Sequence, residues 1–209
     1  MTSLSRSLVL ACALWLSPTF ARADVVADWT KTALDTVAAS GEHLSYRLQA
    51  MAMVHVAMFE ALNFIEGRYT PHFVVIPPMP AGMSPEAAVA GAAHHVLAEL
   101  YPNQRVALAA ALNASLDAIE NDQAKVGSLV TGKSIAGIIC ALRLTSRTDP
   151  PTSEPLSARV SYGSVPAPVD ASRPKLETWM LETAQDFRPA PPPGLNSRVG
   201  LRTRTRSER

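Results

Sequence analysis

Residues 45–65 read SYRLQAMAMVHVAMFEALNFI, and this stretch decides the fold class. Its apolar residues recur at spacings of three and four, which is the period of an amphipathic α-helix. The predicted apolar stripe consists of Leu48, Met51, Ala52, His55, Met58, Phe59, Leu62 and Ile65. Because alanines extend the apolar surface around its sides, we expect this helix at the centre of a bundle.

Four further helices are predicted, at residues 28–40, 84–101, 103–119 and 122–144. The start of the second of these is the clearest, since Ser84-Pro85-Glu86 combines an N-cap serine, a proline in the first turn and an acid. Short connections between the helices favour antiparallel neighbours. The sequence therefore predicts an all-α antiparallel bundle of about five helices over residues 24–144.

The N-terminal residues 1–23 have the pattern of a secretory signal peptide. Arg6 precedes an apolar run at residues 8–16, and Ala21-Arg22-Ala23 forms a small-x-small cleavage site. The apolar run is much shorter than the roughly 20 residues of a membrane span. Charged residues interrupt the most apolar later stretch, so no membrane span is predicted. We expect a periplasmic or secreted protein whose mature chain begins at Asp24.

Overall composition excludes several classes of protein. Hydrophobic residues make up 47% of the chain and charged residues 18%, which is too apolar for disorder throughout. The net charge of +1 gives no basic field for nucleic acid. Of the two cysteines, Cys12 lies in the leader, so Cys140 has no partner for a disulfide in the mature chain.

After residue 144 the composition changes. Ten of the seventeen prolines fall between residues 150 and 193, which indicates a Pro-rich wrapping segment or linker over 145–197, with one short helix at 176–184. Residues 198–209 carry five arginines and one glutamate, and this basic tail is predicted to be disordered. Its composition differs so much from the preceding chain that we interpret it as the product of a reading frame broken near Asn196.

One stretch matches the pattern of a phosphate-binding loop. Residues 127–134, GSLVTGKS, satisfy G-x-x-x-x-G-K-[ST]. Such a loop follows a buried strand and opens a helix, whereas here a helical pattern continues through both glycines. We therefore predict no nucleotide site at Lys133 and Ser134.

Other side chains that could form binding or catalytic sites are predicted to have structural roles. Met51, His55 and Met58 share a helical face and offer Cu(I) ligands, but the same face continues as an ordinary core. His95 and Glu99 are predicted to be a surface pair rather than half of a metal site. Glu60 and Asn63 are expected to pair with Arg47 or Arg68. The stretch Ser40-Gly41-Glu42-His43 places a serine near a histidine but has no third partner for a nucleophile.

An ordered set of short stretches resembles the N-terminal region of bacterial vanadium-dependent haloperoxidases, exported members of the type 2 phosphatidic acid phosphatase (PAP2) superfamily. The matching stretches, in chain order, are Asp28-Trp29, residues 50–69, residues 84–94, Leu100–Gln104 and Phe187–Pro193. The resemblance covers roughly residues 24–195. It implies an all-α fold and a protein that uses bound vanadate to oxidise halide with hydrogen peroxide, or the same pocket to hydrolyse phosphate esters.

In that family the anion is held by a lysine followed by Arg-Pro, a Ser-Gly-His, and an arginine followed by the vanadium-bonding histidine, all in the C-terminal half. None of these motifs is matched here. Arg173-Pro174 and Arg188-Pro189 lack the upstream lysine, and Ser40-Gly41 is followed by Glu42.

We therefore assign no catalytic, cofactor-binding or metal residue to this chain, and vanadate is implied only for the full-length family. The expected partner is the missing C-terminal catalytic half or a second copy of the chain. The alternative interpretation is a complete periplasmic helical binding module, with copper handled through Met51, His55 and Met58.

Overall fold

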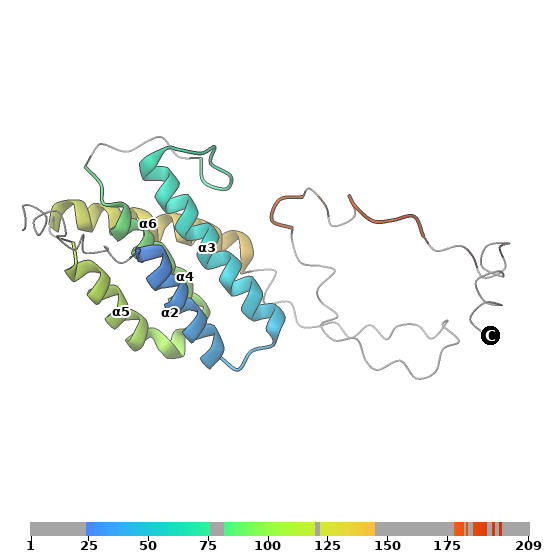
Figure 1. Ribbon diagram of the computed structural model, residues 1–209, viewed down its shortest axis with the longest axis horizontal. Helices are drawn as coiled ribbons and strands as arrows, with labels where there is room; N and C mark the ends of the chain where they lie inside the picture. The colour runs from blue at the N-terminus through green and yellow to red at the C-terminus, as the bar shows by residue number, and fades with distance from the viewer. Residues whose placement is uncertain are drawn as a thin grey trace, which may run out of the picture. The chain divides into compact units, whose positions relative to one another are not determined.

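The computed structural model describes residues 24–75, 82–119, 122–144, 178–181, 183, 186–191, 194 and 197. The chain divides into two compact units, Met1–Thr148 and Asp149–Arg209. The helices of the first unit are α2 (Val25–Ala39), α3 (Leu44–Glu66), α4 (Pro85–Leu100), the short 3-10 helix η1 (Pro102–Gln104), α5 (Arg105–Asp117) and α6 (Asp122–Arg143) (Figure 1). No strand occurs among the described residues, which confirms the all-α prediction. The predicted leader and basic tail, and most of the Pro-rich segment, lie outside the described residues.

The helix boundaries follow the capping chemistry that the sequence indicates. Ser84 Oγ accepts a hydrogen bond from the Ala87 amide at 3.2 Å and donates one to Glu86 Oε2 at 2.9 Å. α3 ends at Gly67, which adopts the left-handed conformation at φ 62° and donates its N–H to the Asn63 carbonyl at 2.7 Å. A left-handed residue at this position favours glycine, which has no Cβ to clash.

The central helix is α4, not α3 as expected from the apolar stripe. α4 packs against α2, α3, α5 and α6. It is buried on nearly every side, at Ala87, Ala88, Val89, Ala90, Gly91, Ala92, Ala93, Val96 and Leu97. The prediction was wrong because hydrophobic periodicity does not register side-chain size. The small residues of α4 let its neighbours approach closely on all sides, which the larger side chains of α3 do not.

α3 also turns a different face to the core from the one predicted. Its buried apolar residues are Ala50, Met53, Val54, Ala57, Met58 and Ala61. Leu48 and Phe59, which belong to the predicted stripe, are 54% and 41% exposed. The alanine side of α3 faces inward because it packs on the small-residue surface of α4, and part of the bulky side is left outside.

α4 and α6 approach each other closely where they cross. A Cβ atom at Gly132 of α6 would lie 2.0 Å from the Ala88 carbonyl oxygen, and one at Gly91 of α4 would lie 2.7 Å from the Leu129 carbonyl oxygen. Buried Ser128 accepts a hydrogen bond from the Ser84 amide at 2.7 Å. Glycines at the crossing therefore let the two backbones touch, and GSLVTGKS is the middle of a continuous helix.

Two helices in the described ranges are long and apolar enough to cross a membrane, which departs from the prediction that no such segment follows the leader. They are Leu44–Glu66 and Gln123–Arg143, each with a mean hydropathy of 1.4 over its most apolar window. Both pack against α4. Length and hydropathy alone do not separate a membrane span from a helix of a soluble bundle.

The second unit is described at few positions. Of the short helix predicted at 176–184, the structure describes residues 178–181 and 183, where residues 179–181 form a bend and Thr178 and Thr183 have no regular structure. The Thr178 hydroxyl donates to the Leu181 carbonyl, and Thr183 donates from both its amide and its hydroxyl to the Asp186 carboxylate. Side-chain bonds of this kind compete with helix formation at the described positions.

Candidate functional site

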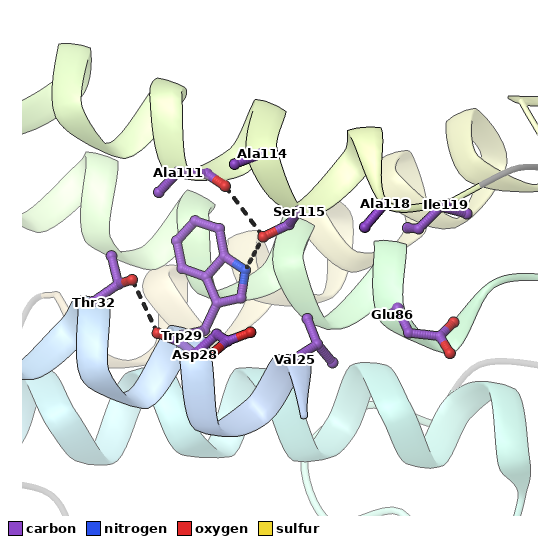
Figure 2. Close-up of a pocket in the computed structure, with 10 residues that line it drawn as sticks. All are labelled: Val25, Asp28, Trp29, Thr32, Glu86, Ala111, Ala114, Ser115, Ala118 and Ile119. Carbon is purple, nitrogen blue, oxygen red and sulfur yellow. Dashed lines mark hydrogen bonds between the residues drawn. The ribbon is translucent and has the colours of Figure 1, made fainter. Parts of the chain in front are cut away.

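A groove of about 420 Å³ lies between α2, α5 and the first turn of α4. Its lining residues are Val25, Asp28, Trp29, Thr32, Glu86, Ala111, Ala114, Ser115, Ala118 and Ile119. Figure 2 shows the α5 side chains along one side of the groove and Val25, Asp28 and Glu86 along the other. The volume falls in the range that small-molecule sites occupy.

Trp29 anchors the groove. Its side chain is 1% exposed, and its indole Nε1 donates to Ser115 Oγ at 3.1 Å (Figure 2). Ser115 Oγ in turn donates to the Ala111 carbonyl at 3.1 Å. On its other side the indole meets the ring of His94 edge to face, with centroids 6.4 Å apart. A tryptophan with its one donor satisfied and its rings packed holds α2, α4 and α5 in fixed relation.

The polar groups of the groove differ in how far they are already used. The Thr32 hydroxyl donates to the Asp28 carbonyl at 2.9 Å, and Ser115 is bonded as described. Glu86 accepts the Ser84 hydroxyl. The exposed carboxylate of Asp28 makes no hydrogen bond or ion pair within the described part of the chain. Charge available to a ligand in this groove is therefore negative.

A second polar feature is a buried clamp behind the end of α3. Glu60 is 2% exposed, and its Oε1 accepts the amides of His72 and Phe73 at 3.1 and 3.0 Å. Asn63 bonds both the carbonyl and the amide of Tyr69, at 2.8 and 2.7 Å. The two side chains tie the turn after α3 back onto the helix. We call Glu60, Asn63 and the bonded turn 69–73 the Glu60 clamp.

The expected pairing of Glu60 or Asn63 with Arg47 or Arg68 was wrong. Arg68 pairs with Glu66, at 2.9 Å between Nε and Oε2. The sequence pattern favoured an ion pair because it could not show that the chain after Gly67 folds back. Backbone amides satisfy a buried carboxylate as well as a cation does, without burying a second charge.

Replacing Glu60 by alanine is expected to lower the free energy of unfolding by about 3 kcal/mol, since it removes the acceptor of two backbone amides and leaves a void at a buried position. Glu60→Gln keeps an acceptor oxygen and is expected to cost about 1 kcal/mol. Urea unfolding followed by circular dichroism measures both. The control is Glu66→Ala, which breaks only a surface pair and is expected to cost under about 1 kcal/mol. Equal losses for Glu60→Ala and Glu66→Ala would contradict the clamp.

The Met51, His55 and Met58 set does not present free ligands together. His55 is exposed, and both its ring nitrogens have neighbours: Nδ1 lies 2.9 Å from the Met51 carbonyl oxygen and Nε2 lies 3.2 Å from Thr30 Oγ1. Met58 is buried in the core. Copper would have to displace one of the His55 contacts. Among the described residues no group of three or more His, Cys, Asp or Glu side chains is placed to hold a metal ion.

The side chains of His95 and Glu99 contact different residues. The His95 ring lies over Gly137, and Glu99 Oε1 lies 4.0 Å from Arg105 Nη2. Nearby, burial raises the pKa of the Cys140 thiol to about 11, with Glu99 adding to the effect. Burial, and then Lys133 and His95, lower the pKa of His94. Near neutral pH this region therefore holds a protonated thiol and an uncharged His94 ring rather than a reactive pair.

The Ser40-Gly41-Glu42-His43 set caps helices. Ser40 Oγ donates to the Val37 carbonyl at 2.8 Å and accepts the Glu42 amide at 3.2 Å. His43 Nδ1 lies 2.8 Å from Ser45 Oγ, not from Ser40. The Glu42 carboxylate accepts the hydroxyl of Tyr101 at 2.9 Å. These contacts close the α2–α3 connection.

The described cations give no sign of a vanadate site. Lys31 pairs with Asp35, Arg68 with Glu66 and Arg105 with Glu99. Buried Arg143 lies over the Phe73 ring, 5.3 Å from its centroid. An oxyanion such as vanadate needs several converging cations and amides. The described residues do not fit vanadate, and no chemical step is derived through it.

Sequence reasoning missed the groove as a site. Half of its lining residues are aliphatic (Val25, Ala111, Ala114, Ala118 and Ile119) and carry no chemical signature, and the set spans residues 25–119. The one usable signal was Trp29 at a buried position of the first amphipathic helix. A tryptophan needs a hydrogen-bond partner when buried, and that partner, Ser115, lies 86 positions away.

Fold and sites together define an all-α helical unit with a small acidic groove and an internal clamp. No protein-family description, curated protein or solved structure matches the chain.

Proposed function

We propose that residues 24–144 are the N-terminal helical scaffold of a vanadium-dependent haloperoxidase-like protein, or of a related PAP2-type phosphatase. In this role the bundle supplies no reacting group. It packs against a catalytic half that carries the vanadate- or phosphate-binding motifs and helps to shape access to that half's pocket. The ordered stretches from Asp28-Trp29 to Phe187–Pro193 support the family assignment.

The observation that carries the scaffold role is an uncharged exposed ridge on α6. It consists of Gln123, Val126, Gly127, Val130, Ser134, Ile138, Ala141 and Leu142, all of them exposed. The cations Lys125 and Lys133 lie at half-buried positions beside it, and Arg143 is buried. A surface helix of a soluble monomer normally has charged residues on its outer face. A long uncharged ridge with exposed Val126, Val130, Ile138 and Leu142 is typical of a surface that another chain or domain covers.

The outer side of α3 supports the same role. Leu44, Leu48 and Phe59 are exposed there, four and eleven residues apart, so they lie along one side of the helix. The Glu60 clamp fixes the turn that leaves this helix. A catalytic half made of helices is a suitable partner for two such surfaces, because ridges of apolar side chains pack into grooves between facing helices.

With the ridge uncovered, the chain is expected to self-associate at micromolar concentration. Replacing Val130 and Ile138 together by lysine should make it monomeric, because two ammonium groups on the ridge would have to be buried on association. Sedimentation velocity measures this change. The matched control is Val106→Lys, which alters an 87% exposed apolar side chain of α5 and should behave as the wild type.

A second experiment adds a catalytic half that carries the family motifs. It measures co-purification of the two chains and vanadate-dependent oxidation of bromide. The proposal expects binding that the double lysine variant loses by at least about tenfold. A wild-type chain that is monomeric and ignores the catalytic half would contradict it. Partition of the wild type into phosphatidylcholine vesicles, abolished by the same lysines, would assign the ridge to lipid instead.

A further inference from the structure

The acidic groove has the composition of a site for a small organic cation. Its walls are apolar, formed by Trp29, Val25, Ile119, Ala111 and Ala114 of α5, and Ala118 just after α5. Its ionisable lining residues in the described part of the chain are Asp28 and Glu86, both acids. We propose that this groove binds an amphiphilic amine: one ammonium group attached to a short aromatic or aliphatic body.

The hydrogen-bonding groups of the groove that have no partner determine the charge of the ligand. Ser115 and Thr32 already donate their hydroxyl protons to backbone carbonyls, so neither has a proton left for an anion. The carboxylate of Asp28 has no partner within the described residues and is exposed on the groove side of α2. An ammonium group supplies the donors that this carboxylate lacks.

The charged groups beside the groove do not cancel its preference for a cationic ligand. At the start of α2, Asp24 adds a further exposed acid and caps the helix through the Val26 amide at 2.9 Å. Lys31, on the same helix, is paired with Asp35 at 2.6 Å. The N-termini of α2 and α4 contribute partial positive charge, but Asp24 and Ser84 already cap them.

The apolar walls favour an organic cation over a metal ion. Calcium takes about six to eight oxygen ligands and magnesium keeps most of its water, whereas the carboxylates lining this groove are those of Asp28 and of Glu86, which already accepts the Ser84 hydroxyl. An amine with a ring or short chain covers those walls and removes apolar surface from water. The inference stands on the groove alone and does not depend on the haloperoxidase proposal.

The test uses the full chain and three probes of one shape: 2-phenylethylamine as its ammonium ion, 2-phenylethanol and 3-phenylpropionate. Titration calorimetry at low ionic strength gives their affinities. The ammonium probe should bind with a Kd of about 1 mM or lower and about fivefold more tightly than the alcohol, the size of a partly exposed ion pair. The carboxylate should be the weakest of the three.

Two substitutions locate the binding. Asp28→Asn should weaken the ammonium probe about threefold to fivefold and leave the alcohol unchanged, since only the ion pair is lost. Its control, Asp117→Asn, removes the same charge from an exposed position of α5 outside the lining and should change neither affinity. Ala114→Phe fills the groove and should abolish binding of both probes, whereas Ala110→Phe, exposed elsewhere on α5, should not.

Three results would overturn the proposal. They are equal affinity for the ammonium and alcohol probes, an Asp117→Asn effect as large as that of Asp28→Asn, and no saturable binding up to about 10 mM, an affinity below that of specific ligands. Unfolding curves of each variant show whether the bundle is intact, so that lost binding is not confused with lost fold.

Discussion

Gly132→Ala is expected to lower the free energy of unfolding by about 3 kcal/mol, the upper end of the usual cost of overpacking a core. The added Cβ would lie 2.0 Å from the Ala88 carbonyl oxygen and 2.8 Å from its carbonyl carbon. Both atoms belong to the backbone of α4, so no side-chain rotation relieves the clash. The two helices have to move apart, which loosens the crossing on which the bundle is built.

The matched control lies in the same GSLVTGKS stretch. Gly127 is exposed, and a Cβ there would meet nothing within 4 Å. Gly127→Ala should therefore stabilise the helix by about 0.5–1 kcal/mol, the difference in helix propensity between the two residues. Urea unfolding followed at 222 nm measures both variants. Opposite signs support the close crossing, and similar small effects at both positions would contradict it.

Trp29→Ala is expected to lower the free energy of unfolding by about 4 kcal/mol, which is in the range for deleting a fully buried aromatic side chain. It removes the packing between α2 and its neighbours, leaves Ser115 Oγ without its donor and removes the edge contact with His94. Trp29→Phe keeps most of the ring volume but loses the hydrogen bond, so its cost should be about 1–2 kcal/mol.

The comparison for Trp29 is Val106→Ala, at an 87% exposed position of α5, which should change stability by less than about 0.5 kcal/mol. Thermal and urea unfolding give the three values. If the free energy of unfolding of Trp29→Ala lies within about 1 kcal/mol of the wild-type value, the indole is not the anchor of the groove. That result would also weaken the proposed amine site, whose shape depends on this side chain.

Local signals in the sequence were sufficient for the helices. Ser84-Pro85-Glu86 and Gly67 mark helix ends through capping and left-handed backbone, which depend on a few neighbouring residues. The helical pattern through residues 127–134 also predicted that the glycines there belong to a helix, as α6 shows. Each of these features is decided within one or two turns of chain.

The packing of the helices against one another could not be predicted from such local signals. That α4 is central depends on how closely alanine and glycine surfaces approach, and the inward face of α3 depends on which helix it meets. The Glu60 clamp depends on a turn that folds back over twelve or thirteen positions. The groove pairs residues of α2 with residues of α5. Such relations are set by tertiary contacts that leave no periodic trace in the sequence.

The central proposal is that this helical unit is the scaffold for a haloperoxidase-like catalytic half. The most direct test is to sequence the DNA through and beyond the codons for Asn196 to Arg209. The account predicts a frame that continues with a lysine and Arg-Pro, a Ser-Gly-His and a final arginine followed by histidine. If no frame there encodes these motifs, the proposal loses its catalytic partner, and a self-contained periplasmic binding module becomes the better account.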